Sequence, residues 1–215
     1  MITYISNNHD DIVADLVQHL WLALIPVVVG AVLSLPVGYF AVRFRSLYQP
    51  IVNLGGLAYS IPSLALFAVI PAVLGTGILS PVNVVVGLSL YTLALLTRTV
   101  ADGLISVRGE ATQAAFAMGF RPLRQLFGVE LPMALPVLFA GLRVATVANI
   151  SLVSVGALVG AGGLGNLFTA GFQLGFVDPI VIGIVLSMLL AALCDVGLVL
   201  LQRRLTPWTR TASRA

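Results

Sequence analysis

The sequence contains no lysine, and all 11 of its basic residues are arginine. Charged residues make up 9% of its 215 positions and hydrophobic residues 59%, whereas about a quarter of the residues in a soluble domain are charged. This shortage of charge excludes a water-soluble fold. The arginines lie at the ends of apolar runs instead of clustering on a polar surface, which excludes a nucleic-acid-binding protein. We therefore expect an integral membrane protein.

Cysteine is almost absent, since Cys194 is the single one and lies inside an apolar run. Neither an intrachain disulfide nor a cysteine-based metal cluster can form, and we expect this side chain to be buried. Basic residues are also missing before the first apolar run, which follows Asp10, Asp11 and Asp15. This run of about 25 residues is too long for a signal peptide, so we expect it to be a membrane span.

Five apolar segments are long enough to cross a bilayer, which requires about 20 helical residues. They are residues 17–42, 51–74, 78–101, 135–159 and 179–202. The glycine-rich stretch 160–178 is too short and polar to cross, and neither a soluble domain nor an internal repeat is expected. The predicted fold class is all-α: a polytopic membrane helix bundle with about five transmembrane helices, forming one domain over residues 1–215.

The arginines predict the orientation in the membrane. With five spans, all eleven fall on one side, and the other side holds Asp10, Asp11, Asp15 and Asp178. Cytoplasmic loops carry the excess of basic residues. The N-terminus is therefore expected outside the cell, and the C-terminus and residues 102–134 inside.

Residues 102–134 predict a helical hairpin on the cytoplasmic side. Strong helix formers occupy residues 110–118, and Gly119 ends that helix. A second helix begins at Pro122, because proline is favoured in a first turn, and ends at Leu131-Pro132. Such a hairpin has an apolar face without a membrane to bury it, so we expect a cytoplasmic partner. A helix lying flat on the bilayer is the alternative.

Residues 113–119 (QAAFAMG) of the hairpin are followed, after nine further residues, by residues 129–132 (VELP). These motifs and their spacing resemble the EAA loop of ABC importer permeases. The pattern of that loop is E-A-A, three residues, G, nine residues, I-x-L-P, and the match has no gap. Gln113 replaces the glutamate of the pattern, so a salt bridge made by that glutamate is not expected here, and Val129 replaces its isoleucine.

Three further motifs extend the resemblance along the chain. Residues 60–66 (SIPSLAL) resemble the I-P-S-L-A-L signature of the osmoprotectant branch, whose permeases serve glycine betaine, carnitine and choline. Residues 160–165 (GAGGLG) resemble a run shared with the methionine branch. Residues 95–99 (LLTRT) lack the proline and asparagine of the branch motif L-L-P-x-x-R-N. The resemblance implies an osmoprotectant importer permease, with an amino-acid permease, such as one for methionine, as the alternative.

The resemblance also implies partners and a location. Two permeases, either copies or paralogues, pair in the bacterial inner membrane among its lipids. ATPase subunits dock inside, and an extracellular substrate-binding protein, expected as a separate polypeptide, docks outside. The permease itself performs no chemistry and needs no cofactor, because ATP binds to the ATPase. We call residues 102–134 the coupling segment; its expected coupling residues are Glu110, Gln113, Ala114, Ala115, Gly119, Leu131 and Pro132.

Small residues of the coupling segment are expected to let it seat in a cleft of the ATPase; these are Ala114, Ala115 and Gly119.

Other candidates are expected to form a pathway or gate, and these are Pro62, Ser63, Asn149, Gly160, Gly162, Gly163 and Gly165. Prolines within the first two spans indicate kinked helices around that pathway, or ordinary packing kinks. For Asn149 an interhelical hydrogen bond is the favoured alternative, and for the glycines a tight connection.

Two ionisable residues occur within the apolar runs, where charge is unfavourable unless it faces protein or water. Arg143 and Asp195 are expected at similar depth and could pair, either as a gate or as a structural ion pair. His9 and His19 lie near the outer end without a partner cluster and are expected to have no special role.

Two other functions are disfavoured. A membrane-embedded lipid enzyme needs acid–base groups at membrane depth, but both glutamates, Glu110 and Glu130, belong to the coupling segment. A passive channel would not need a docking hairpin.

Overall fold

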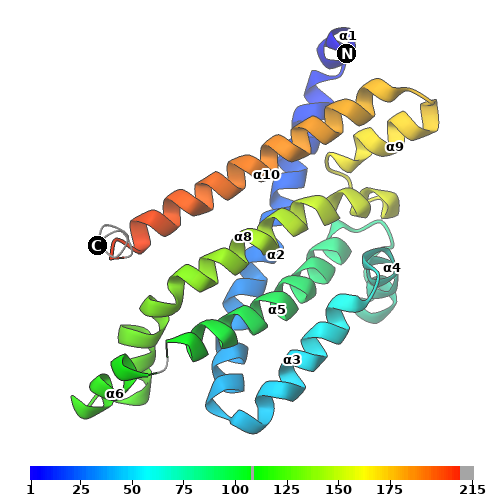
Figure 1. Ribbon diagram of the computed structural model, residues 1–215. Coiled ribbons are helices and arrows are strands. Elements are labelled where there is room, and N and C mark those ends of the chain that lie inside the picture. Colours follow the sequence, from blue (N-terminus) through cyan, green and yellow to red (C-terminus); the bar gives the residue numbers. More distant parts are fainter. Residues whose placement is uncertain (108, 209–215) are drawn as a thin grey trace.

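The computed structural model describes residues 1–107 and 109–208 and consists of helices joined by short turns (Figure 1). No strand occurs in these described residues, so the predicted all-α class is confirmed. In chain order the elements are α1 (Ile2–Asn7), α2 (His9–Arg43), α3 (Arg45–Ser60), α4 (Ser63–Leu74), α5 (Pro81–Ser106), α6 (Glu110–Ala117), α7 (Pro122–Gln125), the π-helix η1 (Leu126–Glu130), α8 (Leu131–Gly156), the 3₁₀-helix η2 (Ala157–Val159), α9 (Gly165–Leu174) and α10 (Val177–Leu205).

Within the described residues, four helical stretches are long and apolar enough to cross a membrane. They are α2, α5, the continuous run Pro122–Val159 and α10, and they correspond to the first, third, fourth and fifth predicted spans. The second predicted span, 51–74, is wrong as a single helix, because α3 and α4 are bent by 100° relative to each other. The described residues thus contain four candidate spans, or five if the bent pair crosses as one.

The bend between α3 and α4 has a local cause at Pro62. A proline disfavours helical backbone at the residue before it, and Ile61 accordingly adopts an extended conformation with φ −65° and ψ 131°. The Ile61 carbonyl accepts a hydrogen bond from the Tyr91 hydroxyl of α5. Pro26 and Pro36, by contrast, lie inside α2 without interrupting it. The position of a proline within an apolar run therefore does not predict whether the helix breaks there.

The central helix is α5, which packs against α2, α3, α4 and α8. Glycines permit the closest approaches: a Cβ at Gly30 of α2 would lie 2.5 Å from the Thr92 Cβ. A Cβ at Gly141 of α8 would likewise lie 2.5 Å from Cγ2 of Thr99. Membrane helices associate through such close packing, because lipid chains are as apolar as the helices themselves.

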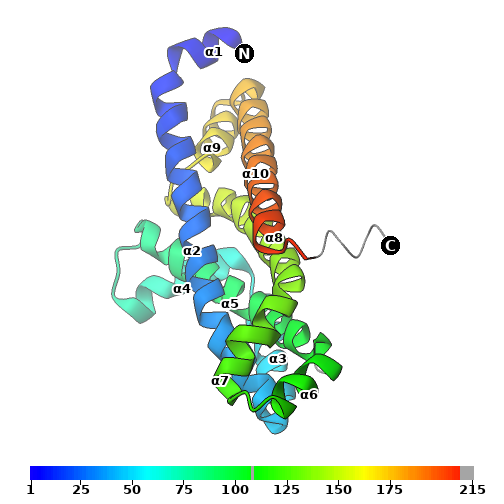
Figure 2. The same ribbon diagram turned by 90° about the vertical axis from the view of Figure 1, so that its left-hand side faces the viewer.

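Seven arginines lie at one end of the bundle, together with Asp102, Glu110 and Glu130, and four aspartates lie at the other end. One end is formed by α1 and the starts of α2 and α10, and the other by α6, α7, the α2–α3 turn and the end of α10 (Figures 1 and 2). The first end holds Asp10, Asp11, Asp15 and Asp178. The second holds Arg43, Arg45, Arg98, Arg121, Arg124, Arg203 and Arg204. This is the segregation of arginine expected from the sequence; Arg143 lies within α8, and Arg108, Arg210 and Arg214 lie outside the described residues.

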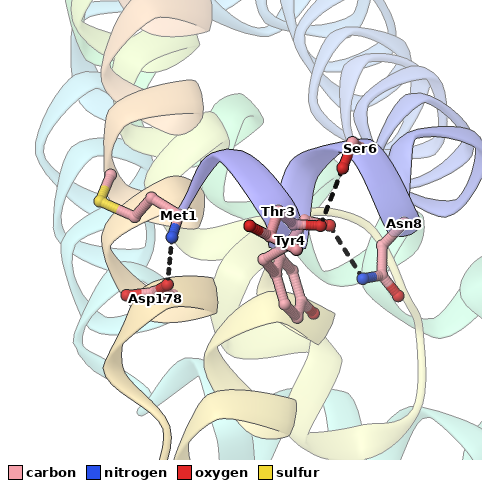
Figure 3. Close-up of polar contacts among 6 residues, drawn as sticks. All are labelled: Met1, Thr3, Tyr4, Ser6, Asn8 and Asp178. Carbon is pink, nitrogen blue, oxygen red and sulfur yellow. Dashed lines mark hydrogen bonds and ion pairs between the residues drawn. The ribbon is translucent and has the colours of Figure 1, made fainter.

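At the acidic end, α1 lies across the start of α10 (Figure 3). The N-terminal amine of Met1 pairs with Asp178, and the rings of Tyr4 and Phe176 are 6.0 Å apart. The Asn8 side-chain amide donates to the Tyr4 carbonyl over 2.9 Å, at the turn from α1 into α2. These contacts fix α1 against the outer end of the bundle.

Candidate functional site

The coupling segment forms a compact helical turn at the basic end of the bundle. Its first helix, α6, ends at a left-handed Gly119 with φ +77°, a conformation that costs other residues about 1–2 kcal/mol. The amide of Phe120 then donates to the Ala115 carbonyl over 3.1 Å, which closes the turn. Pro122 occupies the first turn of α7, as predicted.

The end predicted for the second helix is wrong. Leu131 and Pro132 lie in the first turn of α8, and the helix runs continuously from Pro122 to Val159. A π-helical turn, η1, precedes the proline, and such a turn inserts one residue into a helix without ending it. The start of the segment also differs, since residues 102–106 still belong to α5. Both ends of the coupling segment are therefore continuous with spans.

The predicted coupling residues differ in their exposure to solvent. Gln113, Ala114 and Gly119 are exposed, but Ala115 is only 1% exposed and packs inside its own chain. The expectation that Ala115 seats in a partner is thus wrong. Large apolar side chains are exposed instead: Phe116, Met118, Leu123 and Phe127 are 64–78% exposed. Exposed apolar groups of this size, at the arginine-bearing end, mark a surface that contacts another protein or the membrane.

Arg143 of α8 and Asp195 of α10 form a bidentate ion pair. The Nε–Oδ1 distance is 2.6 Å and the Nη2–Oδ2 distance is 2.7 Å. The side chains are 39% and 29% exposed on the single chain, so the pair lies at its surface and not in its core. Because charge at membrane depth requires protein or water around it, this face of α8 and α10 is not suited to contact lipid chains.

Polar contacts at the outer half of the bundle give His19 a role that the sequence did not predict. His19 of α2 is fully buried. The Leu164 amide donates to its Nδ1 over 3.2 Å, so Nε2 carries the proton and donates to the Ile150 carbonyl at 2.9 Å. The expectation that His19 has no special role is wrong.

The same face of α2 holds the glycine-rich loop at two more points. The Gln18 side chain donates to the Ala161 carbonyl over 2.9 Å and accepts from the Gly163 amide over 3.1 Å. Asp15 accepts from the Asn166 side chain over 2.7 Å. We call these contacts the glycine clasp: Asp15, Gln18 and His19 on α2, with Ala161, Gly163, Leu164 and Asn166 of the loop. It fixes the loop to the first span.

The glycine-rich loop requires glycine at positions 162 and 163. Both have positive φ, +85° and +78°, and a side chain at Gly162 would collide with Gln18. Gly160 and Gly165 pack against Leu79 and Ala157. These four glycines therefore permit the loop to pack closely against its neighbours at the outer end of the bundle.

The remaining pathway candidates lie elsewhere. Asn149 is 2% exposed and donates to Thr92 Oγ1 over 2.9 Å and to the Ala23 carbonyl over 3.4 Å. It thus makes the interhelical hydrogen bond given as the alternative. Pro62 and Ser63 lie at the break between α3 and α4.

Replacing His19 with leucine tests the clasp. The change leaves the Leu164 amide and the Ile150 carbonyl without partners, which we expect to lower stability by about 1–3 kcal/mol. The thermal midpoint of the purified protein and proteolysis at residues 160–166 measure the effect. His9, whose side chain is 66% exposed, is the control, since His9→Leu should change neither. An unchanged midpoint in His19→Leu would show that the clasp is not stabilising.

These features define a class: a membrane-embedded helical protein that exposes an apolar surface at its arginine-bearing end. Residues 30–207 match the family described as binding-protein-dependent transport system inner membrane component. The chain therefore belongs to this family, and the family predicted from the EAA loop is confirmed.

Relatives match over nearly the whole chain. The osmoprotectant import permease protein OsmW of Salmonella typhimurium is 34% identical, covering 96% of this chain and 97% of the relative. The glycine betaine/carnitine/choline transport system permease protein OpuCD of Bacillus subtilis is 32% identical, covering 95% and 89%. The choline permease OpuBD of the same organism is 31% identical, covering 96% and 91%.

Solved structures share the fold. An inward-facing methionine ABC transporter, MetNI, contains a chain that superposes with a TM-score of 0.80 and 25% identity, covering 91% of this chain and 96% of its own. An amino-acid ABC transporter crystallised with histidines has a TM-score of 0.78 at 15% identity, covering 94% and 97%. This protein is thus the permease component of an ABC importer.

Proposed function

We propose that this permease imports a small osmoprotectant with a quaternary ammonium group, such as glycine betaine, carnitine or choline. The observation that carries the proposal is the 31–34% identity, along nearly the full length, to permeases named for these compounds. The motif SIPSLAL at residues 60–66 supports the same branch and forms the break between α3 and α4.

Two partners act at the two ends of the bundle. An ATPase binds the exposed Phe116 and Met118 of the coupling segment and itself binds ATP, so the permease requires no cofactor. An extracellular binding protein delivers substrate at the acidic end. Exposed apolar side chains of α9 support this placement, since Phe172 is 86% and Leu174 74% exposed.

A second permease, either a copy or a paralogue, covers the face of α8 and α10. The Arg143–Asp195 ion pair supports this arrangement, because a second protein subunit removes the pair from lipid. The substrate passes between the two permeases, and its identity is set mainly by the binding protein.

Reconstitution tests the function. The permease, its ATPase and its binding protein are incorporated into proteoliposomes, and uptake of labelled glycine betaine, carnitine, choline and methionine is compared with and without ATP. We expect ATP-dependent uptake of at least one quaternary ammonium compound and none of methionine. Uptake of methionine alone would contradict the proposal, and uptake without ATP would contradict an importer driven by an ATPase.

The amino-acid alternative is less supported. It derives from the likeness to the methionine transporter, at 25% identity, and from the GAGGLG run, which is common to both branches. The proteoliposome experiment distinguishes the two substrates directly.

A further inference from the structure

An apolar groove runs along the inner half of α2. It consists of two adjoining hollows of about 220 and 350 Å³. Both hollows are lined by Val32 and Leu35 of α2, Val100 of α5 and Leu131 of α8. Because they share these walls, they form one groove between α2, α5 and the start of α8.

A polar hollow of about 640 Å³ adjoins the groove at Tyr39, which lines both. It lies between the end of α2 and the coupling segment. Its polar walls are Arg43, Thr112, Gln113, Gln125 and Glu130. An apolar groove thus leads into a polar one at the end where α2 leaves the membrane.

The polar hollow contains two opposite charges that do not pair with each other. Glu130 is 8% exposed, and the Gln125 side-chain amide donates to its Oε1 over 2.9 Å. Within the described residues this is the single hydrogen bond of the carboxylate, and Arg43 forms no ion pair. The Arg124 guanidinium lies 4.7 Å from the ring centroid of Phe120, another wall residue. The buried Glu130 carboxylate and the Arg43 guanidinium therefore both face the polar hollow.

The depth of the groove matches one leaflet. Ala31 and Arg43 are about 18 Å apart along the helix axis, at about 1.5 Å per residue. Half of the hydrocarbon core is about 15 Å thick. The groove is open toward the membrane, since Val32 is 61% and Phe127 66% exposed. A lipid of the inner leaflet therefore fits its length and its opening.

We propose that the groove and the polar hollow together bind one phospholipid of the inner leaflet that carries a primary ammonium, such as phosphatidylethanolamine. An acyl chain fills the groove, the phosphate contacts Arg43, and the ammonium donates hydrogen bonds to Glu130. A choline headgroup has no N–H to donate to this carboxylate. A headgroup with net negative charge would leave Glu130 unpaired beside it.

Native mass spectrometry of the full-length chain, extracted in mild detergent, tests the site. The protein is offered phosphatidylethanolamine, phosphatidylcholine and phosphatidylglycerol with identical acyl chains. We expect roughly tenfold preferential retention of phosphatidylethanolamine over phosphatidylcholine, the ratio that one charge-assisted hydrogen bond provides. Glu130→Gln should abolish this preference, whereas Glu110→Gln, which changes a glutamate outside the hollow, should keep it.

A second pair of variants tests the groove. Val32→Trp should reduce retention of all three lipids, because the indole fills the space of the acyl chain. Val28→Trp is the matched control: Val28 is also 61% exposed but lines neither hollow. Equal retention of phosphatidylethanolamine and phosphatidylcholine by the wild-type chain would overturn the proposal. So would a Glu130→Gln variant that keeps its lipid preference and loses ATPase binding, since the ATPase would then occupy the hollow.

Discussion

Replacing Phe116 with aspartate is expected to abolish ATP-driven uptake while leaving the permease in the membrane at its normal level. The Phe116 side chain is 78% exposed on α6, so its own chain depends little on it. Loss of an aromatic anchor from a protein interface costs about 2–4 kcal/mol, or a roughly 30- to 1,000-fold weaker complex. Co-purification of the ATPase, measured together with uptake, reports the effect.

Two control variants separate the coupling surface from its surroundings. Gln113→Ala should change uptake little, because this exposed side chain forms no hydrogen bond within the described residues. Phe44→Asp places the same charge on a 53% exposed phenylalanine at the same end, outside the coupling segment, and should preserve ATPase binding. Wild-type uptake and ATPase association in Phe116→Asp would contradict the role proposed for α6.

Replacing Arg143 or Asp195 alone is expected to lower the amount of folded permease well below the wild-type level. Either change leaves one charge without its partner at membrane depth, which is unfavourable wherever protein or lipid replaces water. The measurement is the monodisperse fraction in size-exclusion chromatography after extraction from the membrane. Gln202→Ala, a change at a polar position near the inner end of α10, is the reference.

The double variant Arg143→Met with Asp195→Leu distinguishes a structural pair from a pathway pair. If the charges serve only to join α8 and α10, the double variant should recover both folded protein and uptake. Recovery of folded protein without uptake would assign the pair to the pathway. A double variant that folds no better than the single variants would contradict the pairing as the cause of their defect.

Hydropathy predicted most of the fold because membrane spans are specified locally. A run of about 20 apolar residues must become a helix in lipid, whatever its neighbours are. The pairing of Arg143 with Asp195 was also accessible, since their distances from the inner helix ends place them at similar depth. The failure at residues 51–74 has a local cause too, but four prolines occupy the first two spans and only Pro62 ends a helix.

The glycine clasp could not be predicted, because its partners are distant backbone atoms. His19 bonds with groups 131 and 145 residues away in sequence, and no local pattern marks a carbonyl or an amide as available. The spacing of Asp15, Gln18 and His19 on one face of an otherwise apolar helix was the available signal. The π-turn before Pro132 was equally hidden, since a leucine–proline pair alone favours a helix end.

The unbroken helix from Pro122 to Val159 has a mechanical consequence. Its 38 residues correspond to a length of about 57 Å, and it joins the coupling segment at one end to the clasped loop at the other. A tilt of about 5° around its midpoint would displace the two ends by about 2.5 Å in opposite directions. We therefore expect this helix to transmit movement directly: a displacement that an ATPase imposes on the coupling segment would reach the clasped loop through one continuous element of backbone.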